Sequence, residues 1–517
     1  MKGQNKNLTP KESKHPTGQV SRPPVVVILG HVDHGKSSLL EAIRDFDITA
    51  KESGGITQHV GAYEVEGPSS GGHPGKKITF IDTPGHEAFS AIRARGAQVA
   101  DIAVLVADAA DAVQPQTKEA VTVIKKSQIP MIVALNKMDK PTADPEKIKR
   151  ELAKIDIIVE SMGGEVPSVE ISAKTKQGIN ELLELILLVA EMSDLKADIN
   201  SPAEGVVIES YLDRLKGPVV TLIITNGILN KKDIIGTSSA FAKIKNLEDF
   251  QRKTVEKAYP SQPVIVLGWE KCPGVGEKFK QYTTIEEAQK NIKKEEIKVI
   301  SPSVIAVGSD QKVLNVILKS DVLGSLEAIA GVLKDLPQDK IILRILKSGT
   351  GDINDSDVKL AGMSQGQIIG FRVKINQSVL QGLKKDKEKR VKIKTFDIIY
   401  NLIQEVRQMM EKSLTPEIVR QDIGKVKTLV VFWGEKNRQI VGGKIINGEV
   451  RKGLKIEVLR ENEKVGEGKI VNLQRNKKDA ERLIKGDECG VLFEGNTKIQ
   501  EGDILVFYTE ERKKGEL

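Results

Sequence analysis

Residues 30–37, GHVDHGKS, have the types and the spacing of a loop that binds phosphate groups. Glycines allow backbone N–H groups to surround a phosphate, and the lysine adds a positive charge. The N-terminus of a following helix favours negative charge, and a serine hydroxyl can ligate Mg²⁺. The segment follows the apolar run PVVVIL (24–29) and precedes a helical pattern, which is the context such a loop requires. The expected ligand contacts are Gly30, His31, Val32, Asp33, His34, Gly35, Lys36, Ser37 and Ser38.

A second polar motif, DTPG (82–85), follows the apolar run KITFID. Asp82 can hold Mg²⁺ through water, and the Gly85 N–H can meet a γ-phosphate. Thr57 lies between the two motifs and is a candidate for a second Mg²⁺-ligating hydroxyl when a γ-phosphate orders its loop. The predicted magnesium ligands are therefore Ser37, Thr57 and Asp82.

A third motif, NKMD (136–139), follows the apolar run MIVAL and has the residues of a guanine-selective loop. The Asp139 carboxylate can accept hydrogen bonds from N1–H and the N2 amino group of guanine. Adenine lacks this donor pair and would leave a carboxylate unpaired, at a cost of about 1–3 kcal/mol. Asn136 braces the loop, and the Lys137 stem can stack on the base. The motif therefore favours GTP and GDP over ATP, which makes a P-loop kinase or an ATPase the weaker interpretation.

The segment SAK follows the last apolar run of this region. The Ala173 N–H can face O6 of guanine, and we expect Ser172, Ala173 and Lys174 to complete the nucleotide contacts.

These motifs need a parallel sheet to position them. Short apolar runs alternate with helical patterns, which predicts a doubly wound α/β domain whose ligand lies at the carboxyl ends of the strands. The remaining chain predicts a β-barrel, an α/β module without a phosphate loop, a helix and a second barrel. The expected divisions are a disordered basic tail (1–22), the nucleotide domain (23–195), a barrel (196–297), an α/β domain (298–397), a connecting helix (398–414) and a C-terminal barrel (415–517).

Composition limits the remaining classes of function. Of the 517 residues, 39% are hydrophobic and 29% are charged, and no apolar run approaches the length of a membrane span. The two cysteines are far apart in sequence, so we expect neither a disulfide framework nor a zinc site. The net charge of +8 is compatible with an RNA-rich partner. We expect a cytoplasmic monomer without a membrane partner.

GHVDHGKS, GGITQ (54–58), DTPGH, NKMD and SAK together resemble the five nucleotide motifs of the translational GTPases. This resemblance implies that His86 is a catalytic residue together with Lys36. Its imidazole would orient water beside the γ-phosphate, or bond a γ-phosphate oxygen, once rRNA of the large ribosomal subunit draws the ring inward.

The domain order and segments such as GTGDINDSDVKLA (349–361) resemble the bacterial translation-initiation-factor-two family. Membership would imply binding of the 30S and 50S ribosomal subunits and of formylmethionyl initiator tRNA. The family usually has a cysteine at the position of Gly443 and a phenylalanine near Asn476. Many members also have a long N-terminal extension, which we expect to be absent here. The implied contacts of the tRNA end are Gly442, Gly443, Arg460, Arg475, Cys489 and Gly490.

Two alternatives stay open at this point. One is a specialised elongation factor that delivers an unusual aminoacyl-tRNA. The other is a ribosome-associated scaffold that holds GTP as a structural ligand without hydrolysing it.

Overall fold

A computed structural model describes residues 18–44, 61–68, 75–85, 87–292, 312–385, 391–414, 417–435 and 437–513. The chain divides into two compact units, Met1–Arg407 and Gln408–Leu517, and the division falls within one helix.

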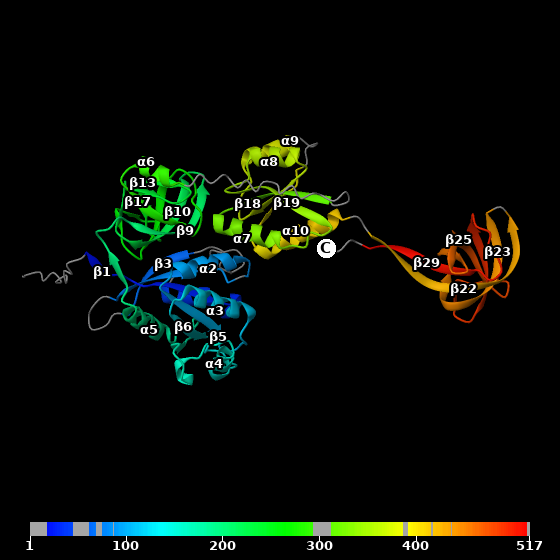
Figure 1. Cartoon of the computed structure of the whole chain (residues 1–517), viewed down its shortest axis with the longest axis horizontal. Coiled ribbons are helices and arrows are strands. Elements are labelled where there is room, and N and C mark those ends of the chain that lie inside the picture. Colours follow the sequence, from blue (N-terminus) through cyan, green and yellow to red (C-terminus); the bar gives the residue numbers. More distant parts are fainter. Residues whose placement is uncertain are drawn as a thin grey trace, which may run out of the picture. The chain divides into compact units, whose positions relative to one another are not determined.

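The first unit begins with a six-stranded sheet in the order β3-β4-β2-β5-β6-β7 (Figure 1). All neighbouring strands run parallel except β3, which pairs antiparallel with β4 at one edge. The strands are β2 (Val25–Gly30), β3 (Gly61–Glu66), β4 (Lys77–Asp82), β5 (Ile102–Asp108), β6 (Met131–Asn136) and β7 (Ser168–Glu170).

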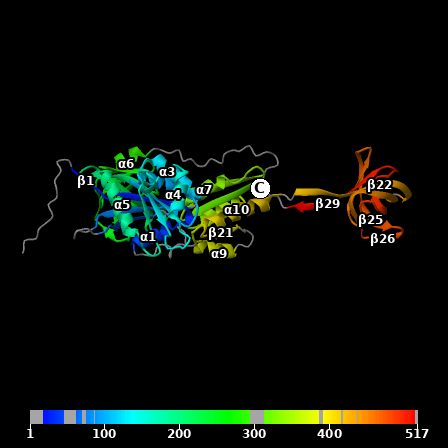
Figure 2. The ribbon, with the colours of Figure 1, turned by 90° about the horizontal axis from the view of Figure 1, so that it is seen from below.

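Helices cover both faces of this sheet because its central strands are apolar on both sides. In β2, Val26 and Ile28 pack toward α1 and α5, whereas Val25, Val27 and Leu29 pack in the cluster that contains α2, α3 and α4. Figure 2 shows α1 and α3 on opposite sides of the domain. The helices are α1 (Lys36–Arg44), α2 (Ser90–Val99), α3 (Pro115–Ser127), α4 (Pro145–Ala153) and α5 (Ile179–Met192).

The structure adds two strands that the sequence did not predict in this region. Residues 61–66, for which no strand was named from the sequence, form the antiparallel edge strand β3. Part of the expected N-terminal tail forms β1 (Gln19–Ser21), which pairs with β8 (Lys196–Asp198). Short polar strands of this kind are set by their partners and carry no periodic signal of their own.

The next part of the unit is a closed barrel. Its sheet has the order β12-β17-β9-β10-β16-β13-β14, and an additional β12–β13 pairing closes it. Its interior is filled by apolar side chains that include Trp269 and Phe279. The strands are β9 (Glu204–Asp213), β10 (Gly217–Asn226), β12 (Ile234–Gly236), β13 (Phe241–Glu248), β14 (Thr254–Val255), β16 (Pro263–Trp269) and β17 (Lys278–Tyr282), with the separate pair β11 (Leu229–Asn230) and β15 (Lys257–Ala258) and the helix α6 (Ile285–Asn291).

A second α/β module follows. Its four strands lie in the order β19-β18-β20-β21 and are all parallel. Its elements are β18 (Lys312–Ser320), α7 (Leu323–Lys334), β19 (Ile341–Thr350), α8 (Asp355–Met363), β20 (Gln367–Phe371), α9 (Gln377–Lys385) and β21 (Ile393–Phe396), followed by α10 (Ile399–Ser413).

The second unit is a barrel whose strand order is β22-β29-β24-β25-β28-β23-β27, closed by a β22–β23 pairing. Its core contains Phe493 and Phe507, both fully buried. The strands are β22 (Glu417–Glu435), β23 (Arg438–Arg451), β24 (Lys455–Arg460), β25 (Glu463–Arg475), β26 (Lys478–Asp479), β27 (Arg482–Ile484), β28 (Glu488–Gly495) and β29 (Ile504–Lys513).

The expected fold class is confirmed: an α/β nucleotide-domain fold and two β-barrels are present. The residue limits of the domains stay predictions. Among the described residues, no helix is long and apolar enough to cross a membrane.

The buried ring of Phe493 gives a test of the C-terminal barrel. We expect Phe493→Ala to lower the free energy of unfolding of this barrel by about 3–5 kcal/mol, because the truncation leaves a cavity in a closed core. Urea unfolding followed by circular dichroism measures the change. Phe493→Leu, which leaves less empty space, should cost clearly less. Equal effects of the two variants would contradict the packing described here.

Candidate functional site

The phosphate loop (residues 30–37) lies between the end of β2 and the start of α1. A short 3₁₀ turn, Val32–His34, fills the space between them. The Lys36 side chain is 3% exposed, and its Nζ donates a hydrogen bond to the His31 carbonyl oxygen at 2.6 Å. The loop therefore wraps around its own lysine, and Ser37 and Ser38 follow in the first turn of α1.

Two glycines in this loop are required by close contacts. Gly35 has φ +85°, and a Cβ there would lie 2.5 Å from Nδ2 of Asn136. A Cβ on Gly30 would collide with the carbonyl oxygen of Val106 on β5. Any other residue at these positions would push the loop away from the neighbouring strands.

His34 is a packing residue of the same loop. Its ring is 2% exposed, and Nδ1 lies 3.4 Å from the Val106 carbonyl oxygen. The His31 ring meets it edge to face at 5.0 Å. Burial, together with the nearby His31, lowers the pKa of His34 to about 4, so the ring is neutral at physiological pH. His34 thus anchors the loop to the sheet without adding charge.

Lys36 lies in a group of buried charges. Burial lowers its pKa to about 8, although the negative charge of Asp82 acts in the opposite direction and that of Arg93 acts in the same direction. Asp82 is fully buried at the end of β4. A Cβ on Gly85 would collide with Lys36 Nζ, which places the DTPG turn directly against the phosphate loop.

Asn136 joins three of the loops that the sequence predicts to surround a nucleotide. Its Nδ2 donates to the His34 carbonyl oxygen at 2.9 Å. Its Oδ1 accepts from the Lys137 amide at 2.8 Å and from the Ala173 amide at 3.0 Å. The side chain is 1% exposed, so these bonds are shielded from water. Residues far apart in sequence are thereby fixed in one arrangement.

The loop formed by residues 136–139 presents a carboxylate at the surface. Ser172 Oγ donates to Asp139 Oδ1 at 2.7 Å, and this bond lowers the pKa of the Asp139 carboxyl. Asp139 is exposed, whereas Ser172 is fully buried. The Asp139 carboxylate is therefore ionised and fixed by the buried Ser172 hydroxyl, and it can still accept hydrogen bonds from a ligand.

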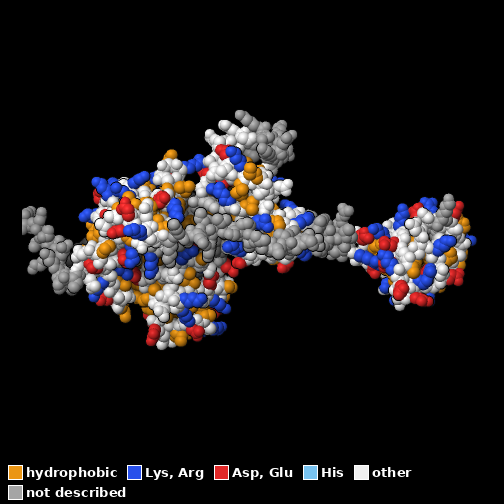
Figure 3. Space-filling view, turned by 45° about the horizontal axis from the view of Figure 1, so that its top comes forward, with side chains coloured by type: hydrophobic (Ala, Val, Ile, Leu, Met, Phe, Trp, Pro, Cys, Tyr) orange, Lys and Arg blue, Asp and Glu red, His pale blue; other side chains and the backbone are white. Residues whose placement is uncertain are grey.

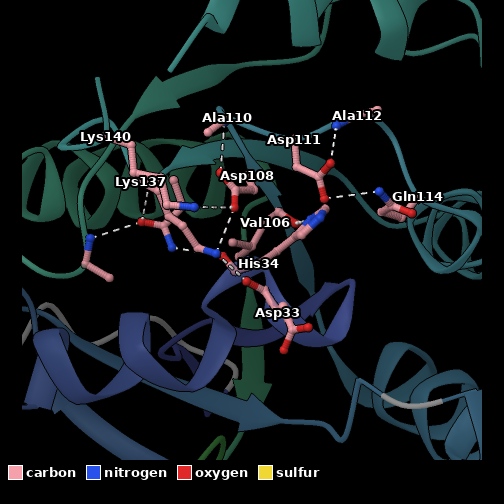
Figure 4. A network of polar contacts seen from close by, with 12 residues as sticks. Asp33, His34, Val106, Asp108, Ala110, Asp111, Ala112, Gln114, Lys137 and Lys140 are labelled. Atoms are coloured by element: carbon pink, nitrogen blue, oxygen red, sulfur yellow. Dashed lines mark hydrogen bonds and ion pairs between the residues drawn. The ribbon is translucent and has the colours of Figure 1, made fainter. Parts of the chain in front are cut away.

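Asp108, at the end of β5, is a site residue that the sequence analysis missed. It accepts from Lys137 Nζ at 2.7 Å and from the Ala110 amide at 2.9 Å, and Lys137 also reaches the Asp33 carbonyl oxygen (Figure 4). Burial opposes ionisation, but the bond from Lys137 holds the pKa of Asp108 below its usual value. Its place after the apolar run IAVLVA at a strand end was the available signal.

These loops line a cleft of about 770 Å³. Eight of the residues in its wall belong to the predicted motifs or directly follow them, and three more residues complete the wall. They are Gly35, Ser38, Asn136, Lys137, Asp139, Lys140, Ala173 and Lys174, together with Glu41, Ala42 and Lys176.

The residues present fit a magnesium ion as a partner of bound phosphate. Asp82 and Ser37 offer a carboxylate and a hydroxyl, which are oxygen ligands of the type Mg²⁺ prefers. In the described part of the chain no cluster of three or more His, Cys, Asp or Glu side chains forms a metal cage. Few protein ligands are expected where phosphate oxygens and water complete the shell. Thr57 and His86 lie outside the described residues.

The C-terminal barrel contains a separate pocket of about 450 Å³. Four of the six residues implied for the tRNA end form two cross-strand pairs in its wall, Gly442 with Gly490 and Gly443 with Cys489. The other lining residues are Leu429, Val430, Phe432, Ile440, Gln474, Asn476, Lys477 and Glu488.

The glycines and the cysteine give this pocket its shape. A Cβ on Gly443 would lie 2.6 Å from the Lys427 carbonyl oxygen, so glycine allows β22 and β23 to approach closely. The Phe432 ring, 68% exposed, covers Gly442. Burial raises the pKa of the Cys489 thiol to about 12, so it is an unreactive apolar wall.

The two arginines implied for the tRNA end do not line this pocket. Arg460 makes two bonds of 2.9 Å to the Asp503 carboxylate and also donates to the Lys498 carbonyl oxygen. Arg475 pairs with Asp487 at 3.0 Å. Figure 3 shows basic and acidic side chains interspersed on the visible face of this barrel.

Comparison with protein families agrees with this architecture. Residues 22–192 match the elongation factor Tu GTP-binding domain, and residues 202–282 match elongation factor G domain 2. Residues 280–407 match translation-initiation factor 2, and residues 438–506 match elongation factor Tu domain 2. The fold, the described motifs at the sheet edge and these matches place the chain among the translational GTPases.

Relatives identify the family within this class. Translation initiation factor IF-2 of Dehalococcoides mccartyi is 42% identical over 95% of this chain and 83% of the relative. The factor of the same name from Pelotomaculum thermopropionicum is 41% identical over 97% of this chain. A crystal structure titled GDP-bound aIF5B from Aeropyrum pernix is 27% identical, covers 94% of this chain and 92% of that one, and has a TM-score of 0.46. The chain belongs to the translation initiation factor IF-2 family. It spans 52% of the length of the Pelotomaculum relative.

The lowered pKa of Lys36 predicts proton uptake on nucleotide binding. Bound phosphate stabilises the charged lysine, so the pKa of Lys36 should rise from its free-state value of about 8 when the nucleotide binds. The free protein then takes up a fraction of a proton on binding, and this fraction should increase from pH 7 to pH 8. Calorimetry of GDP binding in buffers of different ionisation enthalpy measures the uptake. We expect about a tenth of a proton near pH 7 and about half near pH 8.

The matched control is Lys140→Gln, which removes an exposed lysine of the same cleft and should leave the uptake unchanged. An uptake that does not change over this pH range would contradict the assignment to Lys36.

Proposed function

We propose that this chain is a GTP-dependent translation initiation factor that brings formylmethionyl initiator tRNA to the small ribosomal subunit and promotes subunit joining. The observation that carries the proposal is the bonding of Asn136 to both His34 and Ala173. It assembles the phosphate loop and the two base-contacting loops around one cleft. Family membership supports the same activity.

Guanine selection follows from the arrangement of the base loops. Asp139 would accept from N1–H and the N2 amino group, while Ser172 holds the carboxylate in place. The Lys137 stem would lie along the base, and its Nζ is fixed by Asp108. ATP lacks the donor pair that Asp139 would accept from guanine, and the loss of these two hydrogen bonds disfavours its binding.

Phosphate binding uses the buried group of charges. Lys36 would exchange its bond with the His31 carbonyl for phosphate oxygens and stabilise the charge that develops during transfer to water. Ser37, Asp82 and, from the sequence, Thr57 would hold Mg²⁺, which supplies charge neutralisation at the phosphates when bound. The Gly85 N–H would meet the γ-phosphate, so the DTPG turn would distinguish GTP from GDP.

Hydrolysis is proposed to depend on docking to the ribosome. His86 would orient the attacking water only when rRNA of the 50S subunit draws its ring inward. Stimulation of a GTPase by a partner can reach about 10³–10⁵ in rate. GTP would therefore persist until the two subunits join, and its loss would release the factor.

The C-terminal pocket is the proposed site for the formylmethionyl end. Exposed Leu429, Val430 and Phe432 give it an apolar wall suited to a thioether side chain. Gln474 and Asn476 place amide groups at the same pocket, and these can donate to a formyl oxygen.

The test of the catalytic cycle is GTP turnover alone and with 30S plus 50S subunits, with His86→Ala measured in parallel. We expect slow turnover alone, a stimulation of about 10³-fold or more by both subunits, and its loss in the variant. GTP binding should remain unchanged in His86→Ala. Equal turnover with and without ribosomal subunits would refute ribosome-triggered hydrolysis.

The tRNA pocket can be filled without disturbing the barrel. A Cβ on Gly490 would meet nothing closer than 3.8 Å, so Gly490→Val should fold normally and block the pocket. We expect its affinity for formylmethionyl initiator tRNA to fall about tenfold or more, as measured by protection of the ester bond from hydrolysis. Val471→Leu, on the same barrel outside the pocket, is the matched control. Unchanged protection by the Gly490 variant would place the tRNA end elsewhere.

A further inference from the structure

Arg93 on α2 is a buried charge for which the nucleotide-binding motifs give no role. Its side chain is 1% exposed, and it is the largest fully buried side chain of the described residues. Burial of a guanidinium is unfavourable unless hydrogen-bonded partners compensate it. The partners of the Arg93 guanidinium therefore indicate its role.

Two of these contacts connect the DTPG turn to α3. Arg93 Nη1 donates to the Pro84 carbonyl oxygen at 3.1 Å, and Nη2 donates to Glu119 Oε1 at 2.6 Å. The planar guanidinium presents its donors in a fixed fork, so the direction of one bond constrains the other. The position of the Pro84 carbonyl is thus set from the rigid helix α3.

The same part of α3 also holds the phosphate loop. Gln116, one turn before Glu119, accepts a hydrogen bond from the Val32 amide at 3.3 Å. Val32 Cα would lie 3.0 Å from a Cβ on Gly85, so the two loops are in close contact. Helix α3 therefore supports both sides of this contact.

The Pro84 carbonyl and the Gly85 N–H belong to one peptide unit. The unit is trans and planar, so its carbonyl and its N–H point in opposite directions. A bond that fixes the carbonyl also fixes the direction of the N–H. Arg93 thus acts on the group expected to recognise the γ-phosphate, without itself touching the nucleotide.

Electrostatics place Arg93 beside the phosphate-binding lysine. Its positive charge contributes to the lowered pKa of Lys36, although burial is the larger cause. A purely structural ion pair between α2 and α3 would explain the bond to Glu119. It would not explain the second bond to a carbonyl of the nucleotide motif.

We infer that Arg93 is a positioning residue that orients the Pro84–Gly85 peptide and thereby sets the affinity of this protein for GTP relative to its affinity for GDP. The inference rests on the proposed function, because it assumes that Gly85 meets the γ-phosphate. The substrate feature it concerns is the terminal phosphate, and the base and the first two phosphates are held by other residues.

The test is a comparison of affinities for GDP and for a non-hydrolysable GTP analogue, both with Mg²⁺. In Arg93→Met we expect the affinity for the GTP analogue to fall about tenfold to a hundredfold, while that for GDP stays within about twofold. Arg93→Lys, which keeps the charge but loses the fork, should show a partial loss. Glu119→Gln should also show a partial loss, because the guanidinium keeps its bond to the Pro84 carbonyl oxygen.

The matched control is Arg95→Met, two residues along the same helix. Arg95 is partly exposed and pairs with Glu327 on α7 at 2.5 Å, so its loss should leave both affinities unchanged. If Arg93→Met fails to fold, as judged by circular dichroism, Arg93→Lys and Glu119→Gln carry the test.

Each outcome has a distinct meaning. Equal loss of GDP and GTP-analogue binding in the Arg93 and Glu119 variants would show a general structural role and overturn the inference. Unchanged binding of both nucleotides would overturn it as well. A wild-type protein that binds neither nucleotide would instead refute the proposed function.

Discussion

The side-chain amide of Asn136 is the interaction on which the nucleotide site depends. One donor and one acceptor, buried together, bind three loops that follow different strands. A buried amide left without a partner costs free energy, so each bond also enforces the other two. The parallel sheet makes this possible because it brings the carboxyl ends of β2 and β6, and the chain that follows β7, to the same edge. The cleft therefore forms at the edge of the sheet where these strands end. The hydrogen bonds of Asn136 fix the relative positions of three loops at this edge.

Buried charges form a second level of organisation around that edge. Lys36, Asp82, Asp108 and Arg93 are all shielded from water in a domain whose two core clusters are apolar. Such groups are tolerated only where partners are fixed. Here Lys36 and Arg93 donate to main-chain carbonyls and to Glu119 on α3, and Asp108 accepts from Lys137 and from the Ala110 amide. Stability and ligand recognition consequently use the same contacts. A substitution at one of these positions therefore changes both the stability of the domain and its affinity for the ligand.

The sequence predicted the fold class, and it predicted which loops lie together at one edge of the sheet, because chemistry-bearing residues follow apolar runs at strand ends. GHVDHGKS, DTPG, NKMD and SAK each carry a local signal that tertiary packing does not alter. Asp108 and Arg93 were missed because a single acidic or basic residue has no periodic signature, and only the fold shows whether it is paired. Likewise only the fold shows that Arg460 and Arg475, which the family resemblance implies for the tRNA end, pair with Asp503 and Asp487; their role at the tRNA end stays a prediction. Strand β3 was missed because its sequence, GAYEVE, is mostly polar or small.

The strand order of the C-terminal barrel has a consequence for its synthesis. Strand β29, the last to be made, lies between β22, the first, and β24. Val426 pairs with Leu505, so the wall cannot close until segments about eighty residues apart have both left the ribosome. Pairing across such a separation is slow compared with local hairpins. Until then the strand edges of the unfinished barrel would be open to wrong partners.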